Sequence, residues 1–285
     1  MEKIKFTIDS TCDLSKELIE ELNVDVINFF VNLGEKTYRD GLNITPQMIF
    51  DYVSETDILP KTAAPSPEDY IKLFSKYNKE YDYIMHFNIS SNLSAANQCA
   101  IVASQNFDNV IIIDSLSLST GTSLLLLKAN ELMQQGKGAK EIETELNKLK
   151  YNVQASFIIE TLEYLYKGGR CSGLARLGAT ILKLHPMLLL KKGNITVHKK
   201  IRGKIKDVYV DYLKTLKKEF PEPENSYAFI TYTSIDEDIV KLVKSKIEEI
   251  YNFKKIYLTN AGSTVTSHCG EGTLGLLFIN SKNIN

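Results

Sequence analysis

The chain has 285 residues, of which 44% are hydrophobic and 24% charged, and its 34 basic side chains nearly balance 35 acidic ones. This composition is typical of a globular protein with one large or two ordinary domains, and it argues against nucleic-acid backbone binding, which needs a basic surface. The apolar run 124–127 is interrupted by Lys128 and is far shorter than the roughly 20 residues of a membrane span.

The N-terminus and the cysteines indicate the compartment. Acidic and hydroxyl residues from Asp9 onward come too early for the apolar region of a secretory signal. The four cysteines lie far apart and form no C-x-x-C pair, so we expect neither a disulfide framework nor a thiolate zinc site. We therefore expect a cytoplasmic protein. Separately, we expect it to need no metal or cofactor.

In the first half of the chain, short β-rich runs alternate with helical patterns. Strands are predicted at 3–9, 24–33, 82–89 and 109–114, and helices at 13–22, 90–105, 115–133 and 137–150. A strand followed by a hydroxyl-rich turn and a helix, repeated, is typical of parallel α/β architecture. We predict a first α/β domain over residues 1–150.

The second half continues the alternation. Strands are predicted at 153–160, 227–233, 255–260 and 274–280, a hairpin at 187–203, and helices at 206–220 and 236–250, with a further helix running to Gly169. Pro221 and Pro223 end the first of these helices. We predict a second α/β domain over residues 151–285.

Four turns rich in hydroxyl groups are the places where a ligand would bind. They span residues 9–13, 62–66, 90–94 and 114–119. Any one of them alone is typical of a helix cap. Ligands of open α/β sheets bind beyond the carboxyl ends of the strands, so several such turns converging on one crevice would form a site of neutral donors and acceptors.

Familiar catalytic and phosphate-binding motifs are missing. The sequence has no P-loop, no G-x-G-x-x-G after the first strand and no G-x-S-x-G elbow. The stretch 166–178 combines glycines and arginines, but it follows a helical pattern, so Gly168 and Gly169 fit a helix C-cap as well as a phosphate loop.

The four histidines differ in context. His86 lies in an apolar strand pattern typical of a core residue, and neither His185 nor His198 forms a metal-ligand pair with a neighbour. His268 stands among threonines and serines, before Gly270, Gly272 and Gly275. Those glycines would let the backbone approach a ligand closely. From the residues alone, His268 is a ligand-binding donor, a catalytic base or part of an ordinary polar turn, and a role as metal ligand lacks partner residues.

Taken in order, these motifs resemble the DegV family. The resemblance rests on Asp9–Leu14, Thr62–Ser66, Ser90–Ser94, Asp114-Ser115 leading to Gly121, Leu165–Arg170, the Gly193 hairpin, Arg202 and His268–Phe278, and it covers residues 3–280 or so. It implies two α/β domains, the first Rossmann-like with a mainly parallel sheet, and a ligand tunnel at the domain interface. It also implies a fatty-acid-binding subunit of a bacterial fatty acid kinase. Such a subunit holds a long-chain fatty acid, for example palmitate, for phosphorylation by a separate ATP-binding kinase subunit, and the acyl phosphate feeds phospholipid synthesis.

The resemblance also implies roles for individual residues. Thr62, Ser94 and His268 would bind the fatty acid carboxylate, and Arg170 and Arg202 would contact the kinase partner or its phosphate. Supporting contacts are expected from hydroxyl groups in the same turns, namely Ser66, Ser91 and Ser117. The subunit would be non-catalytic alone and would contact a membrane surface transiently, but not nucleic acid.

The sequence departs from the family pattern at 62–66, which is Thr-Ala-Ala-Pro-Ser, and at 93–96, which is Leu-Ser-Ala-Ala. These changes leave open a passive lipid carrier without a kinase partner. A self-contained acyl-transferring or hydrolytic enzyme using Ser94 or Cys269 with His268 is the remaining alternative.

Overall fold

The computed structural model describes residues 2–171 and 185–283. Its first half folds around a parallel sheet of four strands in the order β2-β1-β6-β7. These strands are β1 (Ile4–Asp9), β2 (Asp25–Ile27), β6 (Tyr83–Asn88) and β7 (Val110–Asp114). Every residue of β1 is buried, because a central strand of a parallel sheet is covered on both faces. The predicted parallel α/β architecture is confirmed.

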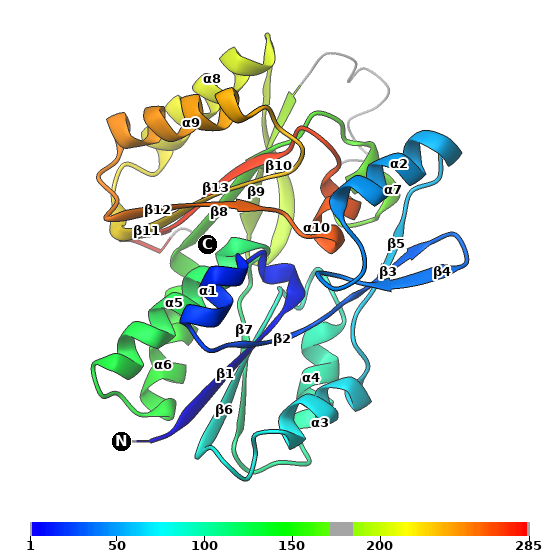
Figure 1. The fold of residues 1–285 in the computed structure, drawn as a ribbon. Helices are drawn as coiled ribbons and strands as arrows, with labels where there is room; N and C mark the ends of the chain where they lie inside the picture. Colours follow the sequence, from blue (N-terminus) through cyan, green and yellow to red (C-terminus); the bar gives the residue numbers. More distant parts are fainter. Residues whose placement is uncertain (1, 172–184, 284–285) are drawn as a thin grey trace.

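Helices cover both faces of this sheet (Figure 1). On one side lie α1 (Lys16–Glu21), α5 (Thr120–Gln134) and α6 (Ala139–Leu149), and on the other lie α3 (Pro67–Ser75) and α4 (Ala96–Ser104). The predicted domain boundary near residue 150 falls at the end of α6, immediately before the first strand of the second sheet.

A small antiparallel sheet and one helix project from the first half. Its strands, in the order β4-β3-β5, are β3 (Phe30–Leu33), β4 (Lys36–Arg39) and β5 (Lys61–Ala63), and α2 (Pro46–Thr56) packs beside them. The sequence predicted one strand over 24–33, which was wrong. The chain leaves the parallel sheet after Ile27, and Phe30 starts a new strand that pairs with β4 and β5.

The second half forms a mixed sheet of six strands in the order β10-β9-β8-β13-β11-β12. The strands are β8 (Val153–Ile158), β9 (His185–Lys191), β10 (Asn194–Ile201), β11 (Pro223–Tyr232), β12 (Lys255–Asn260) and β13 (Leu274–Asn280). Only the β11–β12 pairing is parallel among these described strands. The predicted hairpin is β9 and β10, joined by the two-residue turn Lys192-Gly193.

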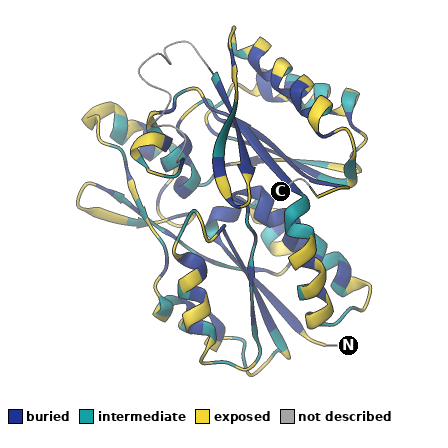
Figure 2. Cartoon of the chain, turned by 180° about the vertical axis from the view of Figure 1, so that it is seen from behind, coloured by how far each residue is buried: buried dark blue, intermediate teal, exposed yellow. Residues whose placement is uncertain are grey.

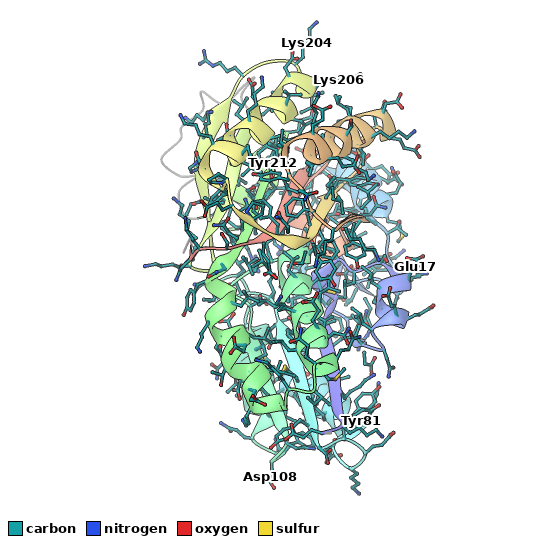
Figure 3. The ribbon with its side chains drawn as sticks, turned by 90° about the vertical axis from the view of Figure 1, so that its left-hand side faces the viewer. Glu17, Tyr81, Asp108, Lys204, Lys206 and Tyr212 are labelled. Atoms are coloured by element: carbon teal, nitrogen blue, oxygen red, sulfur yellow. The ribbon has the colours of Figure 1, made fainter. Side chains whose placement is uncertain are left out.

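Two helices cover the outer face of this sheet, α8 (Ile205–Glu219) and α9 (Glu237–Ile250). Tyr212 of α8 lies beneath that helix (Figure 3), where its hydroxyl donates to the Ser156 carbonyl at 2.9 Å and accepts from the Leu276 amide at 2.9 Å. These bonds fix α8 on two neighbouring strands.

The inner face of the six-stranded sheet is also buried, against the first half. Along β13, Leu276 and Phe278 pack under α8 and α9, whereas Leu277 and Ile279 join the core that contains the parallel sheet and α5. Buried strands therefore run through the middle of both halves, and exposed residues lie on the outer helix faces (Figure 2). The two short helices α7 (Glu163–Lys167) and α10 (Ser263–Cys269) lie at the junction of the halves.

Candidate functional site

A cavity lies where the two halves of the chain meet. The space between its walls is about 570 Å³, including open space at its mouth. Most of its lining side chains are apolar. The lining consists of Thr11, Phe29, Thr62, Ala64, Ile89, Leu93, Ser94, Leu118, Leu165, Arg170, Ile195, Thr264, Val265, His268 and Cys269.

All four hydroxyl-rich turns predicted from the sequence reach this cavity. The first contributes Thr11, the second Thr62, the third Ser94 and the fourth Leu118. The second turn differs from the prediction, because Thr62 lies in strand β5 and only the residues after Ala63 form the turn into α3. The parallel sheet therefore presents its strand ends to the cavity as open α/β sheets do.

Thr62 and His268, which lie 206 residues apart, meet in the cavity wall. The Thr62 hydroxyl and His268 Nε2 are hydrogen-bonded at 2.8 Å. The position of Thr62 is set by its register opposite Val31 of β3, which is fully buried. Because side chains alternate along a strand, a slip of one residue in β5 would turn Thr62 away from His268.

His268 lies near the C-terminal end of α10, which the sequence analysis treated as a polar segment of undefined structure. Its Nδ1 atom is buried and has no hydrogen-bond partner among the described residues. Gly168 approaches it closely, since a Cβ there would lie 2.6 Å from Nδ1. Burial, together with the positive charge of Arg170, lowers the pKa of His268 to about 4. The imidazole is therefore neutral at pH 7.

Arg170 follows α7 and lines the same cavity. Its guanidinium donates to the Gly168 carbonyl at 2.7 Å. Gly168 is the C-cap of α7 and Gly169 has a φ of 70°, so this glycine pair ends a helix as the C-cap interpretation predicted. The rest of the predicted 166–178 stretch, from 172 onward, lies outside the described residues.

Ser94 lies in the loop between β6 and α4, which contacts the second half of the chain. Its hydroxyl accepts a hydrogen bond from the Ala96 amide at 3.2 Å. Earlier in the same loop, the Ser90 hydroxyl donates to the Gly193 carbonyl at 2.8 Å, and the Asn92 side chain donates to the Lys192 carbonyl at 2.9 Å. The β9–β10 turn therefore docks on the loop that carries Ser94.

The other predicted site residues do not line the cavity. Ser66 is the N-cap of α3 and forms a capping box with Asp69. Ser91 is exposed. Ser117 is buried against Gly121, so closely that a Cβ on this glycine would clash with the Ser117 hydroxyl. Arg202 is exposed just after β10.

Two of the three glycines after His268, Gly270 and Gly272, pack against protein and not against the cavity, whereas Gly275 lines the smaller cavity described below. A Cβ on Gly270 would lie 2.8 Å from the Tyr164 ring, and one on Gly272 would lie 2.5 Å from Glu160 Oε2. Their expected role of admitting a ligand is therefore corrected, since they admit side chains of the β8–α7 segment. Both also have positive φ angles, of 74° and 65°.

A second, smaller cavity adjoins the first. Its volume is about 340 Å³, and three residues, Leu118, Val265 and Cys269, belong to the walls of both cavities. Its remaining lining comes mainly from the six-stranded sheet, including Phe157 and Leu277. An extended apolar ligand that passes these three residues would reach the inner face of that sheet.

The sequence analysis named the turn that contains Thr11 and the segment that contains Thr264 but gave neither threonine a role, and both line the first cavity. Thr264 precedes His268 by four residues, so both lie on one face of α10. This spacing would have pointed to Thr264 only if residues 263–269 had been predicted to form a helix. His86, predicted as a core residue, is fully buried and its Nδ1 atom is hydrogen-bonded to Thr7 at 2.8 Å.

Among the described residues, neither Cys269 nor His268 has the surroundings of a catalytic nucleophile and its base. Burial raises the pKa of the Cys269 thiol to about 12, so the thiolate is scarce at neutral pH. His268 lacks a carboxylate on Nδ1 in the described chain, and such an orienting group is what a catalytic triad requires. Among the described residues, no group of three or more histidine, cysteine, aspartate or glutamate side chains could hold a metal ion. In that same part of the chain, no helix combines the length and apolarity needed to cross a membrane.

Comparison with known proteins places the chain in a family. The sequence model of the DegV family, described as uncharacterised proteins, matches residues 3–281. A DegV domain-containing protein of Clostridium acetobutylicum is 32% identical over 98% of this chain and 99% of its own. A Thermus thermophilus DegV family structure, described by its fatty acid binding, has a TM-score of 0.91 and 31% identity over 98% of this chain and 99% of its own.

A second solved structure is DegV of Bacillus subtilis, described as a fatty acid binding protein. It has a TM-score of 0.86 and 26% identity, over 99% of this chain and 100% of its own. Proteins of the DegV family thus bind fatty acids. With a matching family model over nearly its whole length, the chain belongs to the DegV family.

Proposed function

We propose that this protein binds a long-chain fatty acid in the cavity between its halves and presents the carboxylate to a separate kinase subunit. The observation that carries the proposal is the Thr62–His268 pair in the wall of an otherwise mainly apolar cavity that Ser94 also lines. The fatty acid binding of similar DegV family proteins supports it.

The polar side chains suit a carboxylate that must remain reactive. Thr62 and Ser94 offer hydroxyl groups, and His268 is neutral because its pKa is lowered to about 4. Hydrogen bonds from neutral donors are about half as strong as those from charged ones. A carboxylate held in this way keeps an oxygen available for phosphorylation, whereas a bidentate arginine clamp would bind both oxygens.

The apolar walls supply most of the affinity. Transfer of one methylene from water to an apolar environment is worth about 0.8 kcal/mol, so a palmitate tail gains on the order of 10 kcal/mol before ordering costs. The second cavity extends the apolar surface past Leu118 and Val265.

Arg170 is the residue we assign to phosphoryl transfer and not to binding. It lines the cavity close enough to His268 to lower its pKa, and a guanidinium suits an incoming phosphate. Arg202, exposed after β10 beside Lys199 and Lys200, would contact the kinase subunit. The acyl phosphate produced would feed phospholipid synthesis in the cytoplasm. Transient contact with a membrane surface stays a prediction.

The binding step is tested by extracting the purified protein and identifying the lipid by mass spectrometry. We expect a long-chain fatty acid, and a higher melting temperature when palmitate is added to delipidated protein, because a ligand at 100 times its Kd stabilises by about 2.7 kcal/mol. No bound lipid and no stabilisation would overturn the proposal. Acyl phosphate formed with ATP but without any kinase subunit would instead support a self-contained enzyme.

Substitutions separate binding from presentation. Ser94→Ala and His268→Ala should weaken fatty acid binding, whereas Ser91→Ala, in the same loop but exposed, serves as the matched control. Arg170→Ala should keep binding and impair phosphorylation by the kinase subunit. If Arg170→Ala empties the cavity, the assigned division of roles is wrong. If the protein binds fatty acid but no kinase subunit phosphorylates it, a passive carrier is the better description.

A further inference from the structure

Two buried carboxylates from the first half hold the N-terminus of α10. Asp13 accepts the Gly262 amide at 2.7 Å and Asp40 accepts the Ser263 amide at 2.8 Å. Asp13 follows β1 and Asp40 follows β4, whereas α10 belongs to the chain of the second half. Both carboxylates are almost fully buried, with exposed fractions of 5% and 1%.

The pair carries no compensating positive charge. No lysine or arginine among the described residues forms an ion pair with either carboxylate. The titratable groups that face Asp13 are Asp40 and the thiols of Cys12 and Cys269. Two carboxylates buried together cannot both ionise readily, so the pair retains a proton at neutral pH.

The hydrogen bonds and the raised pKa together favour Asp13 as the group that holds this proton. Ser10 accepts the Phe29 amide at 3.1 Å and donates its own hydrogen to Asp40 at 2.9 Å. Both oxygens of Asp40 are therefore acceptors, as in a carboxylate. Asp13 shares one oxygen with the Ser119 hydroxyl, a bond in which either group can donate. Burial raises the pKa of both carboxyl groups, and that of Asp13 to about 8, whereas Ser10 and the Ser263 amide, as donors to Asp40, act to lower the pKa of Asp40.

The same helix is held at its other end by the candidate site. Between Gly262 and His268 there are fewer than two helical turns. A movement of the first turn of α10 would therefore move His268 away from Thr62, to which it is hydrogen-bonded. α10 contains threonine, valine and serine, which are weak helix formers, so its position depends on these outside contacts.

We propose that Asp13 and Asp40 are positioning residues that clamp α10 to the first half, so that His268 meets Thr62 in the geometry that binds a fatty acid carboxylate. The assignment of the ligand rests on the proposed function, but the positioning of His268 does not. Asp40 provides the fixed acceptor. Asp13 holds a proton, which removes the repulsion between two buried negative charges and so lets both carboxyl groups bind the same helix terminus.

The test uses NMR titration of the four histidines in the ligand-free protein and a fluorescent fatty acid for binding. Asp40→Asn cannot accept at both oxygens, so we expect the pKa of His268 to rise from about 4 towards that of an exposed imidazole, and fatty acid binding to weaken about tenfold. Asp69→Asn is the matched control, because Asp69 caps α3 within the first half only.

Asp13→Asn keeps both hydrogen bonds and mimics the protonated acid. We expect normal binding at pH 7 and no loss at pH 9, where the native protein loses affinity as Asp13 ionises. If Asp40→Asn fails to fold, Ser119→Ala removes only the hydroxyl bonded to Asp13 and should shift the His268 titration in the same direction. An unchanged His268 titration in Asp40→Asn and in Ser119→Ala would overturn the clamp whether or not the protein binds fatty acid. A changed titration with no fatty acid binding in the native protein would overturn only the proposed function.

Discussion

The contact between the β9–β10 turn and the Ser94 loop predicts how much stability is lost when Gly193 is replaced. Gly193 has a φ of 77°, and a Cβ there would lie 2.4 Å from the Ser90 hydroxyl and 2.9 Å from the Asn92 side chain. Gly193→Ala should therefore cost about 1 kcal/mol of backbone strain. It should also cost about 1 kcal/mol for each of the two displaced hydrogen bonds.

Gly34→Ala is the matched control. Gly34 also lies in a two-residue hairpin turn, between β3 and β4, with a φ of 61°, but its Cβ would meet only the Tyr52 hydroxyl at 3.6 Å. We expect this variant to lose about 1 kcal/mol, from strain alone. The difference in unfolding free energy between the two variants, about 2 kcal/mol, is the contribution of the contact between the halves.

Thermal unfolding followed by circular dichroism tests the difference. For a chain of this size, 1 kcal/mol corresponds to about 2–4 °C, so Gly193→Ala should melt at least about 4 °C below Gly34→Ala. Fatty acid affinity should fall in Gly193→Ala and not in the control, because only Gly193 contacts the loop that carries Ser94. Equal melting temperatures and equal affinities would refute the reasoning.

Three further expectations concern charge and cavity shape. His268→Gln should make the stability of the protein less sensitive to acid. The lowered pKa of His268 stabilises the fold above pH 6.5, and this contribution is lost as pH falls towards 4. The free energies of unfolding of the two proteins, measured in urea, should therefore diverge in that range. Asp13→Asn should gain stability over the native protein as pH rises from 4 to 8. The raised pKa of Asp13 stabilises the native fold at low pH, and this stabilisation is lost as Asp13 ionises. An equal difference in unfolding free energy at pH 4 and pH 8 would contradict this. Val265→Phe should weaken binding of palmitate more than of octanoate, since Val265 lies in the wall of both cavities, and a competition titration with the two acids checks it.

The strand-and-helix order of the fold was predictable because its pattern is local. Strands such as β1 and β7 alternate along the chain with amphipathic helices, and the periodicity of the hydrophobic residues indicates which segments are strands and which are helices. The small sheet was missed because β3 continues the apolar run of β2 without a turn signal, and because β4 and β5 are mostly exposed. Such strands are defined by pairing between segments distant in sequence.

The candidate site was predictable to a smaller extent. The residues implied by the resemblance that line the cavity are Thr62, Ser94, Arg170 and His268. The helical state of 263–269 was hidden, because its residues favour other conformations and its start is held by Asp13 and Asp40, 249 and 223 residues away. No local pattern carries that information.

The cavity walls belong to the main apolar core. Phe29, Ile89, Leu118, Leu165 and Ile195 all pack in the cluster that joins the parallel sheet to the inner face of the second sheet. A ligand tail would occupy that core as a side chain does, and methylene groups that leave a void or overfill it are costly. The acid of best-fitting length should therefore also be the best stabiliser, so a ranking of melting temperatures over a series of acids would report selectivity directly.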